Sequence, residues 1–303
     1  MEKNFKAYIA WITICILWGT TYLAIKVGVN NLPPFLFAGF RWIIAGPIFL
    51  GILLLKGYKL PDKKDYKHIA IVGIALIGWG NVLVVIAEQW LPSGIAAILA
   101  TTLPFWIVGG ESILPQGPKL NILIFSGLFL GLCGVVIIFW NDLGNLIGNN
   151  LLFGIIALLL AEIGWAFGTI YSKYKTINSS PLVSASLQMI IAGSLQVIIG
   201  LSLGELPRFI FNQNSLLAFG YLTFFASIIG FGSYVYAIKH LPLTLVSTYT
   251  YINPIIALFL GWLILNEELN INTIIGAVII IIAVALVKRG NKSKKKGLEK
   301  KFI

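Results

Sequence analysis

The chain has 303 residues, of which 58% are hydrophobic and only 11% are charged, and its mean hydropathy is +0.92. This composition excludes a soluble globular domain, in which about a quarter of the residues carry a charge. The formal net charge of +11 is then best explained by basic residues that flank membrane segments, which argues against a nucleic-acid partner.

Ten apolar segments follow one another along the chain, each close to the roughly 20 helical residues that cross a hydrocarbon core of about 30 Å. They cover residues 7–29, 33–55, 68–89, 93–114, 120–140, 150–173, 181–203, 215–238, 243–265 and 271–288. Backbone polar groups inside lipid must be satisfied within their own segment, and the residue alternation of a transmembrane β-barrel is missing. The sequence predicts an all-α membrane protein with ten transmembrane helices.

Basic residues are divided unequally between the two sides of this arrangement. With the N-terminus inside, nineteen of the 22 Lys and Arg residues lie on inner segments, Arg41 lies within the membrane, and only Lys26 and Arg208 lie outside. This asymmetry follows the positive-inside rule and predicts that both termini are cytoplasmic. We interpret the basic tail, residues 289–303, as an anchor on the membrane lipid of the inner leaflet rather than as a nucleic-acid-binding arm.

Several phrases of the sequence recur at a nearly constant interval. "RWIIAG" begins at Arg41, and "QMIIAG" begins at Gln188, 147 residues later. Two further pairs are "WGTTYLAIK" (18–26) with "WAFGTIYSK" (165–173), and "LPSGIAAILATTLP" (91–104) with "LPLTLVSTYTYINP" (241–254). The first five predicted helices therefore correspond to the last five.

The repeat predicts a first unit in residues 1–146 and a second unit in residues 147–288. Because five is an odd number, the second unit must enter the membrane from the opposite side. Two similar units in opposite orientations can adopt two near-equivalent packings around a shared midplane site, which is the basis of alternating access. The pattern favours a secondary transporter; the alternative is a duplication that only produced a stable bundle.

The repeated motifs, together with "NVLVVIAEQWLPSGIAAIL" (81–99) and "STYTYINPIIALFLGWLILNEEL" (247–269), resemble the EamA-type transporters of the drug/metabolite transporter superfamily. The likeness covers nearly the whole chain, and its specificity lies in the order and spacing of the motifs. It implies a bacterial inner-membrane carrier, usually an exporter of amino acids, related metabolites or drug-like compounds, with a central cavity between the two halves. It does not name the substrate.

The chain departs from the family pattern in two places. It has "QGP" (116–118) after the fourth helix, where the ninth helix is followed by "NEE" (266–268). The acidic feature common at this place is therefore kept only in the second half. Glu162 precedes the sixth-helix motif, where a small or neutral residue is expected, so a coupling role for Glu162 cannot be inherited from the family.

Arg41 is the basic residue that lies deepest in a predicted span. An ionisable group there costs about 2.5–3.5 kcal/mol and needs a partner or a wet cavity. Its planar fork suits a carboxylate, either of a substrate or of Glu88. Gln188, its counterpart in the second repeat, is a neutral amide. We interpret Arg41 as an anion-recognising group and Gln188 as a second substrate-binding candidate; the alternative for Arg41 is a structural ion pair.

Asn81 and Glu88 are seven residues apart and so share one face of a helix. We predict that Glu88 forms an outer gate or pairs with Arg41, with a simple interfacial carboxylate as the alternative. Glu162 is the deepest carboxylate, and Trp165 and Thr169 follow it on one helical stripe. Desolvation favours its protonated form, so Glu162 is a candidate for proton coupling; a protonated, purely structural residue is equally consistent.

Aromatic stripes supply candidate walls for a cavity. Trp18 and Tyr22 share a stripe of the first helix, and Tyr251 lies on a stripe of the ninth. Such faces hold the apolar part of a ligand or an amine by cation–π contact, although ordinary helix packing gives the same pattern. Pro104 and Pro254, equivalent in the two repeats, interrupt the fourth and ninth helices and are hinge candidates.

Enzyme signatures are lacking. The two histidines, His68 and His240, are too few for a metal site, and no nucleophile elbow or phosphate loop occurs. We therefore predict an exporter of a small metabolite such as an amino acid, with the proton as a candidate coupling ion and no metal or cofactor. A broad-specificity drug exporter is the alternative, and a membrane enzyme or lipid flippase is the alternative of another class.

Overall fold

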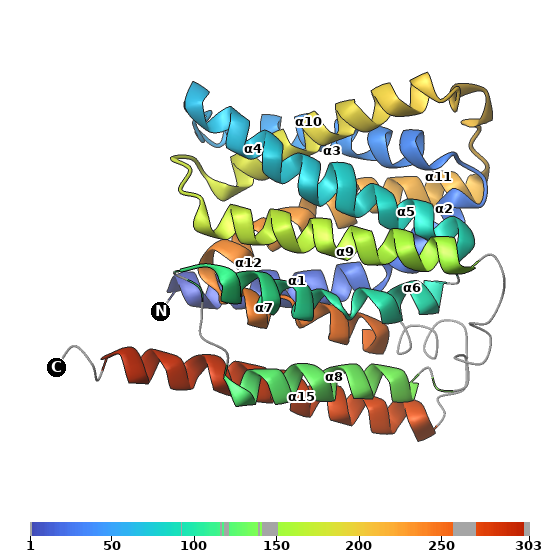
Figure 1. Ribbon diagram of the computed structural model, residues 1–303. Coiled ribbons are helices and arrows are strands. Elements are labelled where there is room, and N and C mark those ends of the chain that lie inside the picture. Colours follow the sequence, from blue (N-terminus) through green and yellow to red (C-terminus); the bar gives the residue numbers. More distant parts are fainter. Residues whose placement is uncertain are drawn as a thin grey trace.

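The computed structural model describes residues 2–91, 93–115, 117, 121–138, 140, 151–256 and 271–299, and these residues contain helices and no strand (Figure 1). The α-helices are α1 (Glu2–Gly19), α2 (Thr21–Val29), α3 (Pro34–Leu55), α4 (Tyr66–Gly73), α5 (Val82–Trp90), α6 (Ser93–Ala100), α7 (Leu103–Ile113), α8 (Ile122–Ile138), α9 (Leu151–Tyr174), α10 (Pro181–Ser202), α11 (Gln213–Tyr221), α12 (Gly232–His240), α13 (Leu243–Val246) and α15 (Ile271–Glu299). Two 3₁₀ turns, Lys63–Asp65 and Leu206–Arg208, and two π-helical segments, Ile74–Asn81 and Leu222–Phe231, join them.

The helices account for the predicted spans. Seven stretches of the described residues are long and apolar enough to cross a membrane, namely Phe5–Val29, Pro34–Leu55, Lys63–Trp90, Ile95–Ile113, Leu151–Tyr174, Pro181–Ser202 and Gln213–His240. α8 is a shorter apolar helix of 17 residues, and α15 continues an apolar segment into the basic tail. The ninth span begins with α13 and helical residues 249–256; its remainder and the "NEE" positions lie outside the described residues, as do Gln116 and Pro118.

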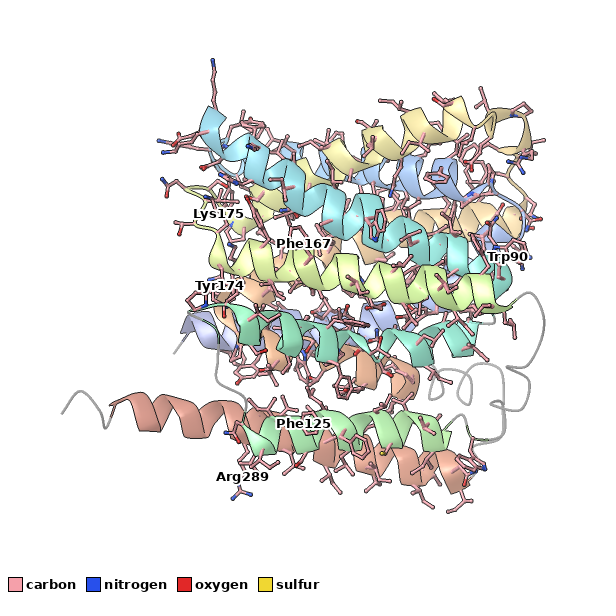
Figure 2. The ribbon with its side chains drawn as sticks, in the orientation of Figure 1. Trp90, Phe125, Phe167, Tyr174, Lys175 and Arg289 are labelled. Carbon is pink, nitrogen blue, oxygen red and sulfur yellow. The ribbon has the colours of Figure 1, made fainter. Side chains whose placement is uncertain are left out.

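The outside of the bundle is apolar, as a protein dissolved in lipid requires. Large side chains such as Trp90, Phe125 and Phe167 are 45%, 53% and 54% exposed around it (Figure 2). The molecule is therefore a multi-pass membrane protein.

Equivalent helices of the two repeats run in opposite directions. Lys26, near the end of α2, contacts the end of α5, and Trp90 of α5 packs on Phe153 at the start of α9, with ring centroids 5.6 Å apart. The end of α2 therefore lies beside the start of α9 (Figure 1). At the other end of the bundle, the backbone N–H of Asn178 donates to the Asp65 carboxylate at 3.2 Å. The basic loop before α4 and the loop after α9 thus share one end.

Several predicted spans are interrupted where a continuous helix was expected. Thr20 separates α1 from α2, because the hydroxyls of Thr20 and Thr21 bond the carbonyls of Leu17 and Trp18, each at 2.8 Å, in competition with the backbone. The turn at 101–102 separates α6 from α7.

The third helix of each repeat contains a π-helical segment, at Ile74–Asn81 and at Leu222–Phe231. Each segment offers a carbonyl to another helix. Gln196 Nε2 donates to the Ile77 carbonyl at 2.7 Å, and Trp18 Nε1 donates to the Ala226 carbonyl at 3.1 Å. π-Helical turns occur often at functional sites.

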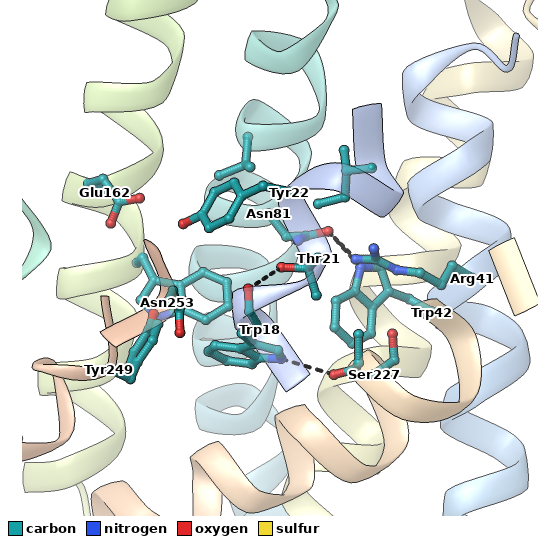
Figure 3. Close-up of a pocket in the computed structure, with 14 residues that line it drawn as sticks. Trp18, Thr21, Tyr22, Arg41, Trp42, Asn81, Glu162, Ser227, Tyr249 and Asn253 are labelled. Atoms are coloured by element: carbon teal, nitrogen blue, oxygen red, sulfur yellow. Dashed lines mark hydrogen bonds between the residues drawn. The ribbon is translucent and has the colours of Figure 1, made fainter. Parts of the chain in front are cut away.

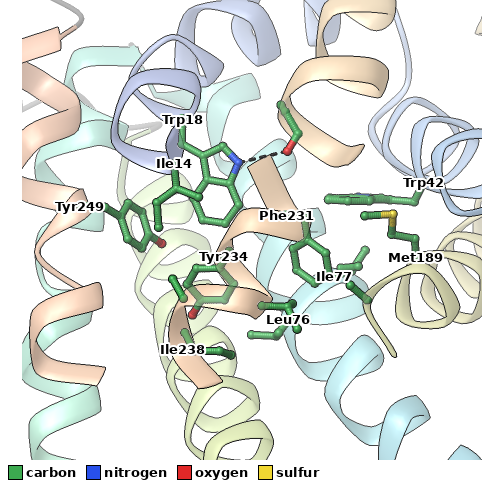
Figure 4. Close-up of a cluster of buried hydrophobic side chains, with 14 of the residues drawn as sticks. Ile14, Trp18, Trp42, Leu76, Ile77, Met189, Phe231, Tyr234, Ile238 and Tyr249 are labelled. Carbon is green, nitrogen blue, oxygen red and sulfur yellow. Dashed lines mark hydrogen bonds between the residues drawn. The ribbon is translucent and has the colours of Figure 1, made fainter. Parts of the chain in front are cut away.

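Aromatic rings fill the centre of the bundle (Figure 4). The Trp18 ring lies 5.5 Å from Trp165, 5.2 Å from Tyr234 and 5.1 Å from Tyr249, measured between centroids. Trp18 and Trp165 are the equivalent residues of the two repeats. The two repeats therefore contact each other through equivalent tryptophans.

A lysine at the end of the first helix in each repeat binds the end of the third. Lys26 Nζ donates to the carbonyls of Glu88 and Leu91, at 2.6 and 3.1 Å. Lys173 Nζ donates to the equivalent carbonyls of Ile238 and Leu241, at 2.6 and 2.8 Å. Cations stabilise helix C-termini because the last carbonyls lack intrahelical partners. We call these contacts the lysine caps.

Replacing Lys173 by Met should lower the free energy of unfolding by about 1–3 kcal/mol, because the carbonyls of Ile238 and Leu241 lose a charged donor. Thermal unfolding of the purified protein in detergent measures the effect. Lys175→Met, two residues away and exposed, is the matched control and should keep the wild-type midpoint. Equal midpoints for the two variants would show that the cap contributes nothing to stability.

Candidate functional site

A cavity of about 70 Å³ lies where the two repeats meet (Figure 3). Its lining comes from both repeats and comprises Trp18, Thr21, Tyr22, Ile25, Arg41, Trp42, Asn81, Val84, Glu162, Trp165, Ala226, Ser227, Tyr249 and Asn253. Ordinary ligand pockets measure about 300–1,000 Å³, so the cavity in this conformation has room for a few water molecules only. A metabolite needs the helices around it to separate.

Arg41 is held at the cavity by a neutral partner. Its side chain is 2% exposed, and Nη2 donates to Asn81 Oδ1 at 2.5 Å. Trp42 Nε1 donates to the same oxygen at 2.9 Å, and the Arg41 guanidinium lies 4.5 Å from the Trp42 ring centroid. Within the part of the chain that the structure describes, Arg41 Nε has no hydrogen-bond partner. The guanidinium therefore has donor capacity left for an anion.

The predicted ion pair between Arg41 and Glu88 is not formed. Both carboxyl oxygens of Glu88 are buried without a hydrogen bond to any described residue, and Glu88 does not line the cavity. The side chain is 0% exposed, which differs from an interfacial carboxylate. Lys26 of the same repeat binds the Glu88 backbone carbonyl. Asn81, about two helical turns earlier, takes the place expected for Glu88.

Glu162 lies on the opposite side of the cavity from Arg41 (Figure 3). Its side chain is 6% exposed. Tyr22 lies between Asn81 and Glu162, and its hydroxyl is on the Glu162 side (Figure 3). The cavity thus has a guanidinium at one side, a carboxyl group at the other and aromatic rings between them.

Thr169, Gln188 and Tyr251 do not line this cavity, although the sequence patterns pointed to them. Thr169 positions a neighbour: its hydroxyl bonds the Tyr234 hydroxyl, which also accepts from Trp165 Nε1 at 2.9 Å. Gln188 is buried, and its Oε1 has no partner among the described residues. Tyr251 faces the other way, toward α8, where its hydroxyl donates to the Leu128 carbonyl at 3.0 Å.

Residues 247–248 form a turn, and this turn explains why Tyr251 faces away from the cavity. A continuous helix from residue 243 places Tyr251 on the stripe of Ser247, but the turn changes the phase of the helix that follows. Tyr249 and Asn253, four residues apart, face the cavity as a result. The Asn253 side chain faces two acceptors, so we assign its amide nitrogen to that side, where it donates to the carbonyls of Cys15 and Tyr249 at 3.1 and 2.9 Å. This assignment links the helix to α1.

Trp42 and Ser227 were also missed. Trp42 directly follows Arg41, and adjacent residues of a regular helix do not face one another; the bulky Trp42 nevertheless reaches the same Asn81 oxygen. Ser227 lies in a π-helical segment, whose changed period removes the usual pattern. Its Oγ is buried and has no partner among the described residues.

Replacing Asn81 by Leu should lower the free energy of unfolding by about 1–3 kcal/mol, because Arg41 and Trp42 both lose the acceptor that they share. Asn81→Asp keeps an acceptor at the same place and should stay close to the wild-type midpoint. Thermal unfolding in detergent distinguishes the two. If both variants unfolded with the wild type, the shared oxygen would not be needed to hold Arg41.

Comparison with known proteins assigns this arrangement to a family. The EamA-like transporter family matches residues 5–140 and again residues 152–289. The uncharacterized inner membrane transporter YedA of Escherichia coli (strain K12) is 35% identical over 93% of this chain and 90% of its own length.

More distant proteins are similar over almost the same length. The uncharacterized transporter YoaV of Bacillus subtilis (strain 168) is 26% identical over 91% of this chain and 94% of its own. A WAT1-related chloroplastic protein, At3g02690 of Arabidopsis thaliana, is 26% identical over 94% and 70%. One crystal structure of a protein has the same fold, with a TM-score of 0.77 at 21% identity over 93% of this chain and 96% of that one. The chain belongs to the EamA-like transporter family, of which it contains two copies of the characteristic unit.

Proposed function

We propose that this membrane transporter exports an amino acid or a related small metabolite by alternating access. The observation that carries the proposal is the central cavity, where Arg41 and Glu162 lie at opposite sides of a space lined by both repeats. A compound with a carboxylate and an amine matches these two groups, and the aromatic rings between them suit its carbon skeleton.

Alternating access is supported by the architecture around the cavity. The two repeats are inverted in this proposal, since α9 runs opposite to α1 and α2, and they meet at a shared midplane site. The cavity is too small for a metabolite in the present conformation, so binding requires movement. The turn at 101–102, just before Pro104, and the turn at 247–248, six residues before Pro254, are proposed hinges, because a broken helix bends where its backbone bonds are already absent. Pro254 itself lies inside the helical residues 249–256, so the ninth helix is interrupted before this proline and not at it.

The distribution of basic residues supports an orientation of the protein in the membrane, and a relative supports its location. We place the end of the bundle that carries the Lys56–Lys67 loop and both termini in the cytoplasm, following the positive-inside rule. The relative YedA is described as an inner membrane transporter, which supports the same membrane here. Residues 1–146 and 147–288 are the proposed repeats, and the basic residues 289–303 are a proposed inner-leaflet anchor.

Arg41 is the proposed carboxylate-binding group. Replacing it by Ala should lower transport of a carboxylate-bearing substrate about 10- to 100-fold, as expected for loss of a hydrogen bond to a charged group of about 1.5–3 kcal/mol. A metabolite profile of the medium of cells with and without the protein identifies the substrate, and flux into proteoliposomes then measures the effect.

Gln188→Ala, at the equivalent and equally buried position, is the matched control and should transport normally. Size-exclusion chromatography checks that both variants remain folded. Undiminished transport by the Arg41 variant would refute the assignment. If that variant still moved lipophilic cations, a broad-specificity drug exporter would be the better description.

Glu162 is the proposed proton-coupling group. In Glu162→Gln the side chain keeps its size and an oxygen that accepts from the amine of the substrate, but it cannot release a proton. Transport driven by a pH gradient should therefore stop, while exchange of substrate without a gradient continues. Glu111→Gln is the control, because Glu111 bonds Tyr174 at 2.8 Å and lies outside the cavity. A Glu162→Gln protein whose transport still followed the proton gradient would remove Glu162 from this role.

A further inference from the structure

A second, larger hollow lies on the outer surface between α7 and α9. Its volume is about 520 Å³, within the usual range for ligand sites. The apolar side chains that line it include Trp106 of α7 and Leu114, which directly follows α7. From α9 they include Ile163, Phe167 and Ile170. We call it the α7–α9 groove. The central cavity is on the other face of α9, which bears Glu162 and Trp165.

The groove faces the lipid phase. Trp106, Ile163 and Phe167 are 41%, 41% and 54% exposed. Ile163 lies midway along α9, and Tyr174 and Lys175 lie at its end (Figure 2). Because Tyr174 and Lys175 also line the groove, it runs from the middle of the membrane to the end of the bundle. An elongated apolar ligand with a polar head fits this shape.

Positive charge gathers at the polar end of the groove. Lys239 Nζ donates to the carbonyls of Ser172 and Lys175, and Lys173 caps α12 nearby. Three ammonium groups therefore surround the end of α9. The carboxylate of Glu111 faces the same region, but the Tyr174 hydroxyl bonds it at 2.8 Å. The excess of cations favours an anionic head, and Lys175 is the exposed member of the group.

We propose that the α7–α9 groove binds an anionic phospholipid, with an acyl chain between Trp106 and Phe167 and the headgroup phosphate at Lys175. Basic pockets between membrane helices on the cytoplasmic side recognise such headgroups. The apolar part of the groove has nothing to bind the polar atoms of a metabolite.

The headgroup part of the proposal is tested with the full chain in detergent. Native mass spectrometry measures binding of phosphatidylglycerol and of phosphatidylcholine with identical acyl chains. The wild type should prefer phosphatidylglycerol, and Lys175→Gln should reduce its binding about fivefold, the factor expected for one lysine near an anionic surface. Lys59→Gln, an exposed lysine in the loop before α4, should bind as the wild type does. The basic tail is unchanged in all variants and so cancels in the comparison.

The groove itself is tested with a pair of adjacent glycines. A Cβ at Gly110 would lie 2.5 Å from Ile170 Cδ1, whereas a Cβ at Gly109 would have no atom within 4 Å. Gly110→Leu should therefore fill the groove and weaken binding of both lipids, and Gly109→Leu should not. Thermal unfolding confirms that both variants remain folded.

Three results would overturn the proposal. The first is equal binding of the two lipids by the wild type, which would assign the groove to an apolar ligand without a headgroup. The second is normal phosphatidylglycerol binding by Lys175→Gln or by a folded Gly110→Leu protein. The third is a dimer that Gly110→Leu dissociates, which would assign the groove to a second copy.

Discussion

Backbone carbonyls that lack a partner within their own helix must find one elsewhere in the protein, because the hydrocarbon core offers none. In this molecule the partners are side chains of other helices. Trp18 bonds the Ala226 carbonyl and Gln196 bonds that of Ile77, both in π-helical segments. Lys26 and Lys173 bond the carbonyls at the ends of α5 and α12. Each of these π-helical segments and helix ends is thus a point where two helices are bonded to each other.

The scaffold is nearly symmetric, but the side chains at its centre are not. Arg41 and Trp42 of the first repeat correspond to Gln188 and Met189 of the second, and Asn81 corresponds to Phe231 by its place at the end of a π-helical segment. Trp42 and Phe231 meet across the centre, with ring centroids 5.5 Å apart (Figure 4). At these equivalent positions the first repeat therefore has the polar group that binds Arg41, while the second has an apolar ring that packs on Trp42. Duplication of the five-helix unit places the cavity between the repeats, and different side chains at equivalent positions determine which groups line it.

The sequence was sufficient for features that depend on hydropathy and on the repeat. The apolar spans, the central place of Trp18 and Trp165 and the burial of Arg41 all follow from residue type and position. It was insufficient where helix phase depends on backbone breaks. The turn at 247–248 moves Tyr251 out of the cavity and brings in Tyr249 and Asn253. Hydropathy does not report such a turn, because its residues remain apolar or hydroxylated, and the same limit applies to the two π-helical segments.

α9 separates the central cavity from the α7–α9 groove, and this position links the two. Glu162 and Trp165 face the cavity, whereas Ile163 and Phe167 face the groove. Widening a cavity of about 70 Å³ to admit a metabolite requires α9 or the helices opposite it to move. Since proteins are closely packed, a movement of α9 away from Trp18 reduces the space between α9 and α7. If α9 is the helix that moves, a ligand in the groove opposes the widening of the cavity.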